Sequence, residues 1–420
     1  MEFTRSEKPL KANMAWNSIG SLTYFGCQWL ITILVVRLSE SYEQAGILSL
    51  AMSVANIFTP FALYRMRAYQ VSDVKNDFST SEYMGLRIIT VSSALAVCMV
   101  YACFTCSPSS LLAIFLYLCF KSTELFIDVM QGLLQKHMRL DYAGKSMIVR
   151  GGLSVASFAG TLFFTDSLEL AIASMIAVSM VVALLIDIPA ARCFDSLKPC
   201  FSISNFRYVL LQCLPVVIAS VATGAAMSVS KQLLGSLQGE NVLGIYSSVA
   251  APVAIVQLGA SYIYSPILGR FANFHLKHDK RAFFDLLARI SIAIAVIAIG
   301  CAAVFQWFGP AVVTLLYGAE TASYCYLLLP MIVCSVLTAY QLFLSDLLLS
   351  IREFTGNCLG GMASLLVSLL LSAMLIDRYG MNGVSVTGIA AYSISSLISL
   401  VFLIRKIRRD ADLNGCHPQR

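Results

Sequence analysis

Three ionisable residues lie inside one otherwise apolar segment of this 420-residue chain. Lys121, Glu124 and Asp128 fall within residues 111–133, and at about 100° per residue they share one narrow arc of a helix. Charged side chains at bilayer depth are costly, so they usually face a bundle interior or a water-filled cavity. The arc therefore predicts a polar interior enclosed by a lipid-facing exterior.

Two kinds of chemistry are open to this arc. Lys121 and Glu124 are spaced i, i+3, which suits a purely structural salt bridge. Asp128 has no partner in that arrangement, and a buried carboxylate without a fixed cation can take up a proton. Glu124 and Asp128 are therefore candidates for ion coupling. The same arc continues through a further set of polar residues, namely Gln131, Gln135 and Arg139.

The composition indicates a polytopic helical membrane protein. Hydrophobic residues make up 58% of the chain and charged residues only 12%, whereas soluble domains average about 25% charged. Apolar segments of about 20 residues, the length that spans a bilayer, recur along the chain. The twelve predicted spans are residues 13–36, 44–64, 86–106, 111–133, 147–165, 168–190, 208–234, 242–268, 284–308, 322–350, 357–376 and 382–404.

Basic residues gather on one side of these spans. The N-terminus, the even-numbered loops and the C-terminal tail hold 25 of the 29 Lys and Arg residues, including Arg65, Arg87 and Arg150. The positive-inside rule then makes this side cytoplasmic, with both termini inside and the chain in the cytoplasmic (inner) membrane. Asp187 and Asp346 fall near this side and are expected to be interfacial. The outer loops are short, so the spans themselves must handle any substrate.

The sequence lacks the residue patterns typical of metal sites, catalytic sites and nucleic-acid binding. The thirteen cysteines are scattered, and the one CxxC pair, Cys103 and Cys106, has no further ligands nearby for a four-ligand metal site. The four histidines fall in polar connections or in the tail. The net charge of +6 is spread over many short loops, which does not favour nucleic acid as a partner. We therefore expect no metal, no cofactor and no catalytic residue.

The two halves of the chain resemble each other. Gly46-Ile47-Leu48-Ser49 opens the second span and Gly244-Ile245-Tyr246-Ser247 opens the eighth, while Arg87-Ile88 and Arg289-Ile290 begin the third and ninth. Six spans per half is an even number, so the repeat is parallel about an axis along the membrane normal. The predicted fold is all-α integral membrane: twelve transmembrane helices in two six-helix bundles related by a pseudo-two-fold. The predicted parts are residues 1–190, a linker at 191–207, residues 208–405 and a tail at 406–420.

Two further spans carry polar faces. The first span has Asn13, Asn17, Ser21, Tyr24 and Gln28 at helical spacing, and the seventh, its repeat partner, has Gln212, Ser220, Thr223, Ser230 and Lys231. Such faces serve either as helix–helix hydrogen bonds or as a cavity wall. Lys231 and Arg37 lie near the outer ends of their spans, where a long cationic side chain can also snorkel to the interface.

Three short motifs accompany this plan: RMRAYQVSD at 65–73, LGIYSSVAAP at 243–252 and LYGAE at 316–320. With the twelve spans and the long inner connections, they make the chain resemble the polysaccharide-exporter branch of the multidrug/oligosaccharidyl-lipid/polysaccharide (MOP) flippase superfamily. Within it, the chain is similar to O-antigen and capsule repeat-unit flippases.

This resemblance implies translocation of an oligosaccharide linked to a polyprenyl diphosphate, by alternating access between two rocking bundles. It implies a lipid-linked oligosaccharide as partner, beside membrane lipids, a coupling cation (H⁺ or Na⁺) and a polysaccharide polymerase. The residues expected to bind substrate are Lys121, Lys231, Arg65, Arg37, Asn17, Tyr24, Gln28 and Gln131, with Glu124 and Asp128 at the coupling ion.

Two alternatives stay open. A cation-coupled multidrug extrusion antiporter of the same superfamily would share the fold and use Glu124 or Asp128 to couple cation entry to drug exit. A membrane enzyme that processes glycans is disfavoured, because the longest outer connection is far too short for a catalytic loop or domain and no convergent catalytic set is present.

Overall fold

Helices make up all the regular structure of the described part of the chain. The structure is a computed structural model that describes residues 9–73, 78–264 and 267–415. Within these ranges, twelve helical segments are long and apolar enough to cross a membrane, which confirms the predicted count and a multi-pass membrane protein. The basic or histidine residues Arg5, Lys8, Lys75, His417 and Arg420 lie outside the described residues.

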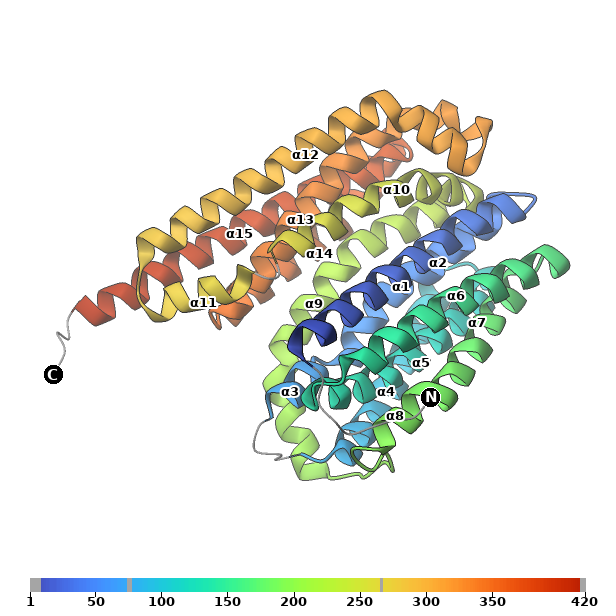
Figure 1. Ribbon diagram of the computed structural model, residues 1–420. Helices are drawn as coiled ribbons and strands as arrows, with labels where there is room; N and C mark the ends of the chain where they lie inside the picture. Colours follow the sequence, from blue (N-terminus) through green and yellow to red (C-terminus); the bar gives the residue numbers. More distant parts are fainter. Residues whose placement is uncertain (1–8, 74–77, 265–266, 416–420) are drawn as a thin grey trace. The chain divides into compact units, whose positions relative to one another are not determined.

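The contacts divide the chain into two compact units, Met1–Val217 (unit 1) and Ile218–Arg420 (unit 2). Unit 1 is built from α1 (Leu10–Leu38), α2 (Glu43–Leu63), α3 (Met66–Ser72), α4 (Thr80–Thr105), a 3₁₀ turn (Pro108–Ser110), α5 (Leu111–Lys136), α6 (Leu140–Thr165), α7 (Leu168–Val182), a π-helical turn (Ala183–Asp187) and α8 (Ile188–Arg192) (Figure 1).

Unit 2 comprises the rest of the chain from the middle of α9. Its helices are the second part of α9 (Ile203–Gln238), α10 (Glu240–Tyr264), α11 (Leu268–Leu276), α12 (Lys280–Tyr317), a 3₁₀ segment (Ala319–Leu327), α13 (Leu328–Ser350), α14 (Phe354–Tyr379) and α15 (Asn382–Gly415). The first part of α9 packs with unit 1, where the Tyr64 hydroxyl donates to the Leu210 carbonyl at 3.0 Å. The predicted linker limits, residues 191 and 207, stay predictions.

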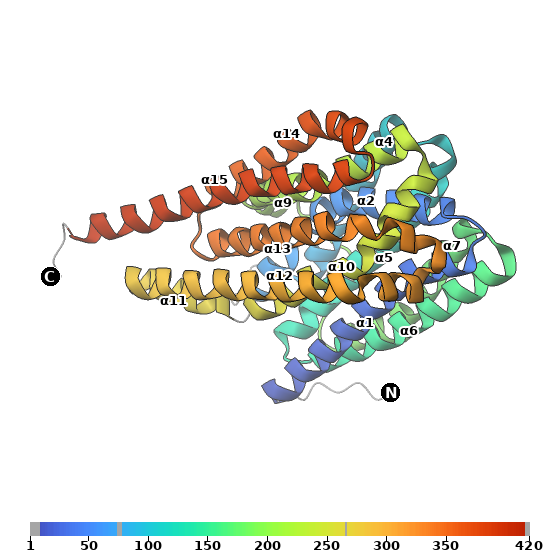
Figure 2. The same ribbon diagram turned by 90° about the horizontal axis from the view of Figure 1, so that it is seen from above.

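Each unit packs its six spans with the same neighbours. In unit 1, α5 contacts α2, α4 and α7; in unit 2, α13 contacts α10, α12 and α15. The short helices repeat this pattern, since α3 lies on α5 and α11 on α13. Figures 1 and 2 show the matching pairs, with α6 beside α7 and α14 beside α15. The predicted fold class, an all-α membrane protein with two six-helix bundles, is confirmed.

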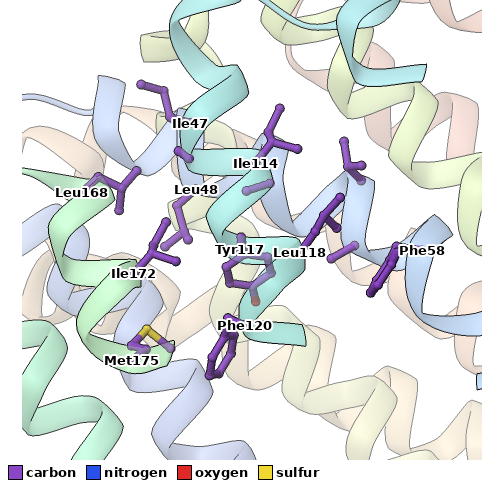
Figure 3. Close-up of a cluster of buried hydrophobic side chains, with 14 of the residues drawn as sticks. Ile47, Leu48, Phe58, Ile114, Tyr117, Leu118, Phe120, Leu168, Ile172 and Met175 are labelled. Carbon is purple, nitrogen blue, oxygen red and sulfur yellow. The ribbon is translucent and has the colours of Figure 1, made fainter. Parts of the chain in front are cut away.

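Apolar side chains fill both the centre and the outside of each bundle. Figure 3 shows the core of unit 1, where Phe58, Leu118 and Phe120 pack together with no exposed surface. The outside is apolar as well: Val97 is 55% exposed and Leu370 is 68% exposed. Contiguous apolar exteriors of this kind suit a lipid solvent, and water would penalise them heavily.

Several predicted boundaries were wrong by four residues or more. The third, fifth and ninth spans begin at Thr80, Leu140 and Lys280, and the ninth extends to Tyr317. The predicted third and fifth spans, 86–106 and 147–165, contain Arg87 and Arg150, but both arginines were counted with the cytoplasmic loops because basic residues gather there. In the structure Arg87 and Arg150 instead lie inside helices and are buried, so they were wrongly assigned to loops.

Glycine allows the first and fifth spans to approach at backbone distance. A Cβ built on Gly20 would lie 2.5 Å from Gly144 Cα, and one on Gly144 would lie 2.2 Å from the Trp16 carbonyl oxygen. The repeat-related pair of helices, α9 and α14, meets in the same way, since a Cβ built on Gly361 would lie 2.7 Å from the Ala219 carbonyl oxygen. Small residues at such crossings are typical of helix packing in membranes.

We expect Gly144→Val to destabilise unit 1 by about 1–3 kcal/mol or more, because the added Cβ collides with backbone that cannot rotate away. Gly152→Val on the same helix is the matched control, since nothing lies within 4 Å of its Cβ. Thermal unfolding of both purified variants in detergent measures the difference. Equal melting temperatures would contradict the close packing of α1 on α6.

Candidate functional site

A buried arginine lies at the centre of the polar interior of unit 1. Arg150, ten residues after the start of α6 at Leu140, is only 4% exposed. Its guanidinium carbon lies 4.8 Å from the centre of the Tyr24 ring on α1. Its Nε and Nη1 atoms are buried and have no hydrogen-bond partner. A buried guanidinium with unused donors is a site prepared for an acceptor that the protein does not itself supply.

Lys121 and Glu124 on α5 face this arginine. Their side chains form the structural salt bridge that the i, i+3 spacing allows, with Nζ and Oε2 at 2.8 Å. The other carboxylate oxygen of Glu124, Oε1, is buried and has no partner. Arg150 interacts electrostatically with both residues. The pair therefore neutralises itself and leaves the charge of Arg150 uncompensated by a direct salt bridge.

Asp187 adds a carboxylate to the cluster, next to Ser146, which lies one turn before Arg150 on α6. Asp187 ends the π-helical turn and is 1% exposed, so its predicted interfacial position was wrong. One carboxylate oxygen accepts a hydrogen bond from the Ser146 hydroxyl at 2.6 Å, and the other has no partner. Asp187 also interacts electrostatically with Arg150. Single π turns within helices frequently mark functional sites, because they re-aim the side chains at the turn.

The polar face of α1 turns toward α6. The Asn13 amide joins the two helices by hydrogen bonds with the Met138 carbonyl and the Asp141 amide. Further along the helix, the Tyr24 hydroxyl and the Gln28 amide nitrogen are buried without a partner. At Asn13 this polar face therefore serves helix–helix packing. At Tyr24 and Gln28 it contributes buried polar groups without a hydrogen-bond partner. Asn17, between Asn13 and Tyr24, is half-buried.

A second ionic cluster, separate from Arg150, holds Asp128. Its two carboxylate oxygens accept from Arg67 Nη1 at 3.0 Å and from Arg87 Nη2 at 3.1 Å. Arg67 also contacts the side-chain oxygens of Gln131 and Gln135. The premise that Asp128 lacks a fixed cation was wrong: it has two, from α3 and α4. Both arginines had been assigned to the loop after the second span, so no pairing with α5 was expected.

We expect Asp128→Asn to cost about 3–5 kcal/mol of stability, because it leaves the fully buried guanidinium of Arg87 without its counter-charge. Arg67→Gln should cost only about 1 kcal/mol, since that side chain is 29% exposed and Arg87 still compensates Asp128. Thermal or denaturant unfolding of the two variants in detergent distinguishes them. Similar losses from both would show that Arg87 does not depend on Asp128.

The remaining predicted site residues lie apart from the Arg150 cluster. Arg65 is exposed at the turn that precedes α3, with a left-handed φ of 54°, and Arg37 is exposed in the last turn of α1. Gln131 is buried beside Arg67, with its amide nitrogen unpartnered. The structure thus brings together Tyr24, Lys121 and Glu124. The binding and coupling roles of all the predicted residues stay predictions.

Lys231 lies in unit 2, within the apolar part of α9. It is half-buried, and in the described residues no salt bridge joins it to a carboxylate. Its neighbours are small and polar or sulfur-bearing: Ser230 exchanges a hydrogen bond of 2.8 Å with Ser372, and Cys334 interacts electrostatically with Lys231. Lys231 and Arg150 are therefore two span cations, one in each unit, that no carboxylate neutralises by a salt bridge.

The sequence missed Arg150, Asp187, Arg67 and Arg87 as interior residues. A signal for Arg150 was available, because it lies inside the predicted fifth span, 147–165, with apolar residues 147–149 directly before it. The other pairings join helices that are distant in sequence. Within the described residues, no group of three or more His, Cys, Asp or Glu side chains is placed to hold a metal ion.

Comparison with solved structures defines the class of fold. A MATE-family multidrug resistance transporter of the MOP superfamily superposes with a TM-score of 0.74 at 12% identity, over 98% of this chain and 100% of that one. The Vibrio cholerae MATE transporter VcmN, as a point mutant, gives 0.64 at 12% identity over 95% and 97%. A MOP-superfamily transporter of Pyrococcus furiosus gives 0.60 at 16% identity over 99% and 100%. The fold is that of MOP-superfamily transporters.

One curated relative narrows the resemblance. The chain is 22% identical to the capsular polysaccharide biosynthesis protein CapF of Staphylococcus aureus over 384 residues, which cover 91% of this chain and 96% of that protein. No protein-family model matches the chain. The predicted resemblance to the polysaccharide-exporter branch of the MOP superfamily is confirmed by this relative together with the shared fold.

Proposed function

We propose that this protein moves an oligosaccharide linked to a polyprenyl diphosphate across the cytoplasmic membrane by alternating access. The observation that carries the proposal is the pair of unneutralised span cations, Arg150 in unit 1 and Lys231 in unit 2. A cation at bilayer depth is costly unless an anion or water compensates it. The negative charges of a diphosphate that arrives with the cargo would supply this compensation.

The carboxylates of the spans support an anionic cargo over a cationic one. Glu124 is paired with Lys121, Asp128 with two arginines, and Asp141 with Arg139 at 2.8 Å. Asp187 accepts from Ser146 and Asp346 from the Tyr264 hydroxyl. Each of these acids has a donor within the protein. The salt bridges neutralise Glu124, Asp128 and Asp141, and Asp187 opposes Arg150 without a salt bridge. Among the described residues, Lys231 is then a span cation without an opposing carboxylate, which favours an anionic ligand.

The similarity to CapF, a capsular polysaccharide biosynthesis protein, supports a glycan as the cargo. The Pyrococcus furiosus relative is described as having a binding pocket of reverse polarity, from which a different function was suggested for it. A change of pocket polarity on this fold is thus compatible with a change of cargo. We assign the chain to export of an anionic lipid-linked sugar on these grounds.

Each predicted contact then has a place in the mechanism. Arg150 in unit 1 and Lys231 in unit 2 each contact phosphate oxygens at some stage of transport, since guanidinium and ammonium groups form charge-assisted hydrogen bonds with phosphate. Sugar hydroxyls contact the amides and the phenol of the interior; these groups are Asn17, Tyr24, Gln28 and Gln131. Lys121 also binds the diphosphate when Glu124 is protonated and no longer forms its salt bridge. Arg65 and Arg37, exposed at opposite ends of their helices, attract the diphosphate at each membrane surface. The polyprenyl chain remains in lipid.

Coupling to H⁺ or Na⁺ is assigned to Glu124 alone. Its Oε1 atom is buried and unpartnered, which leaves room for a proton or a cation. Asp128 is saturated by Arg67 and Arg87, so we assign it a structural role. Protonation of Glu124 would release Lys121 from its salt bridge. A polysaccharide polymerase on the outer face would receive the cargo, with both termini of this chain in the cytoplasm.

The second candidate function is cation-coupled multidrug extrusion, and the MATE-family fold is the observation that favours it. Such a protein would bind a lipophilic cation at an unpaired carboxylate. We propose transport, not catalysis, as the activity in either case. Binding of a cationic dye such as ethidium, measured in parallel with flipping, separates the two candidates.

Flipping is measured with the purified full chain in liposomes that carry a fluorescent polyprenyl-diphosphate oligosaccharide, by quenching or enzymatic capture at the outer leaflet. We expect Arg150→Gln and Lys231→Gln each to slow flipping at least about tenfold, since each removes one charge-assisted contact of about 1.5–3 kcal/mol. Arg378→Gln is the matched control, because it removes one exposed span-end cation of unit 2 and should leave the rate unchanged.

The proposal is overturned if both interior variants flip at the wild-type rate while remaining folded by size-exclusion chromatography. Transport of ethidium by the wild type, without any flipping of the lipid-linked sugar, would replace it with the antiporter.

We expect Glu124→Gln to uncouple flipping from the ion gradient, because an amide cannot release a proton or bind Na⁺ as a carboxylate does. The rate measured with an imposed pH or Na⁺ gradient should fall to the rate measured without one. Asp128→Asn, assayed at a temperature where it is folded, should keep its response to the gradient. A gradient response retained by Glu124→Gln would remove the coupling role of this residue.

A further inference from the structure

Unit 2 ends in a dense group of exposed cations that the transport mechanism does not use. They lie on α11, on the first turns of α12 and on the last described turns of α15. The exposed members are Arg270, Lys277, Arg281, Arg289, Arg405, Arg408 and Arg409. We call this group the α11 basic surface. Where exposure is described, the exposed acids on the same segments are Asp279 and Asp285. Asp410 and Asp412 follow Arg409 in the sequence, so the seven cations outnumber the four acids and the local charge is positive.

A common core holds these three segments together. Phe271 of α11, Phe283 of α12 and Ile407 of α15 belong to one cluster of buried apolar side chains. Each is next to or near a cation of the surface: Arg270 precedes Phe271 and Arg408 follows Ile407. The core therefore fixes the cations on one end of unit 2.

Most of these cations are unused inside the protein. In the described residues, no salt bridge engages Arg270, Lys277, Arg281, Arg289 or Arg408. One of the two exposed acids is already occupied, because Asp279 caps α12 by accepting from the Ala282 amide at 3.0 Å. In unit 1, by contrast, Arg67, Arg87, Arg139 and Lys145 all pair with aspartates.

The surface also has the features of a segment that lies at a membrane interface. α11 begins seven residues after the span that ends at Ser261, and the next span starts at Lys280. Phe271 on its inner side is fully buried, while Leu276, beside Lys277, is 74% exposed. An exposed apolar residue among basic residues suits the boundary between acyl chains and headgroups.

We propose that the α11 basic surface binds the headgroups of anionic phospholipids. Arg and Lys form charge-assisted hydrogen bonds with lipid phosphates, and clusters of several basic residues directly beside a span attract anionic lipids. This end is the one predicted to face the cytoplasm by the positive-inside rule. Bound lipid anchors α11 and the start of α12 at the interface. The role is independent of the transported cargo.

Native mass spectrometry of the full chain in detergent, titrated with phosphatidylglycerol or phosphatidylcholine, tests the proposal. The wild type should prefer phosphatidylglycerol, and high salt should weaken that preference by screening. The variant Arg270→Gln/Lys277→Gln/Arg281→Gln/Arg408→Gln should lose at least about fivefold of the preference.

The matched control removes four exposed cations from unit 1: Lys11→Gln/Arg192→Gln/Lys198→Gln/Arg207→Gln. It makes the same change in net charge and should keep the preference within about twofold, because its cations lie on separate segments. Melting temperatures of both variants near that of the wild type confirm that they are folded.

Three results would overturn the proposal. The first is a wild type without preference for phosphatidylglycerol. The second is an equal loss in both variants, which would reduce the effect to net charge. The third is an unchanged lipid preference in the surface variant together with lost binding of a poly-glutamate peptide, which would assign the surface to an acidic protein.

Discussion

The structure depends on one constraint, which is that a charge within the bilayer must be compensated by an opposite charge, by hydrogen bonds or by water. Unit 1 meets it mostly with ion pairs. Asp128 lies between Arg67 and Arg87, and Glu124 accepts from Lys121. These pairs join α3, α4 and α5, so they also fix the bundle. The exceptions, Arg150 and Lys231, are then the positions where a ligand or water must contribute.

The two bundles repeat each other in packing but differ in the chemistry of their interiors. Unit 2 meets the same constraint with hydroxyl groups, and its last two spans bury serines without any exposed surface: Ser364, Ser368, Ser372, Ser385, Ser395 and Ser399. Serine hydroxyl groups form hydrogen bonds with backbone carbonyls and with one another and carry no net charge to bury. One example is the hydrogen bond that Ser395 donates to the Gly360 carbonyl at 2.7 Å. Lys231 is the notable charge in that setting. Among the described residues, unit 1 therefore holds the interior salt bridges, while the last two spans of unit 2 rely on buried hydroxyl groups.

The sequence predicted the architecture better than the site. Twelve spans follow from the length of the apolar segments, which the bilayer dictates directly. The pair Lys121–Glu124 follows from spacing along a single helix. Arg87 and Asp128 are 41 residues apart, and Asp187 meets Ser146 across two helices. Such partners depend on how helices pack, and no local pattern carries that information. The buried Arg150 was missed because it was counted with the basic residues of the cytoplasmic side, although it lies inside the predicted fifth span.

The central claim is that the interior of each bundle, at Arg150 in unit 1 and at Lys231 in unit 2, is hydrated at some stage of the transport cycle. Single cysteines at these positions, in a variant without the thirteen native cysteines, measure this directly with a charged, membrane-impermeant thiol reagent in intact vesicles. We predict labelling at both positions, and none at a cysteine replacing Val97, which is 55% exposed on the apolar outside of α4. Labelling of neither interior position, in the presence or absence of an ion gradient, would mean a dry interior and would contradict the account.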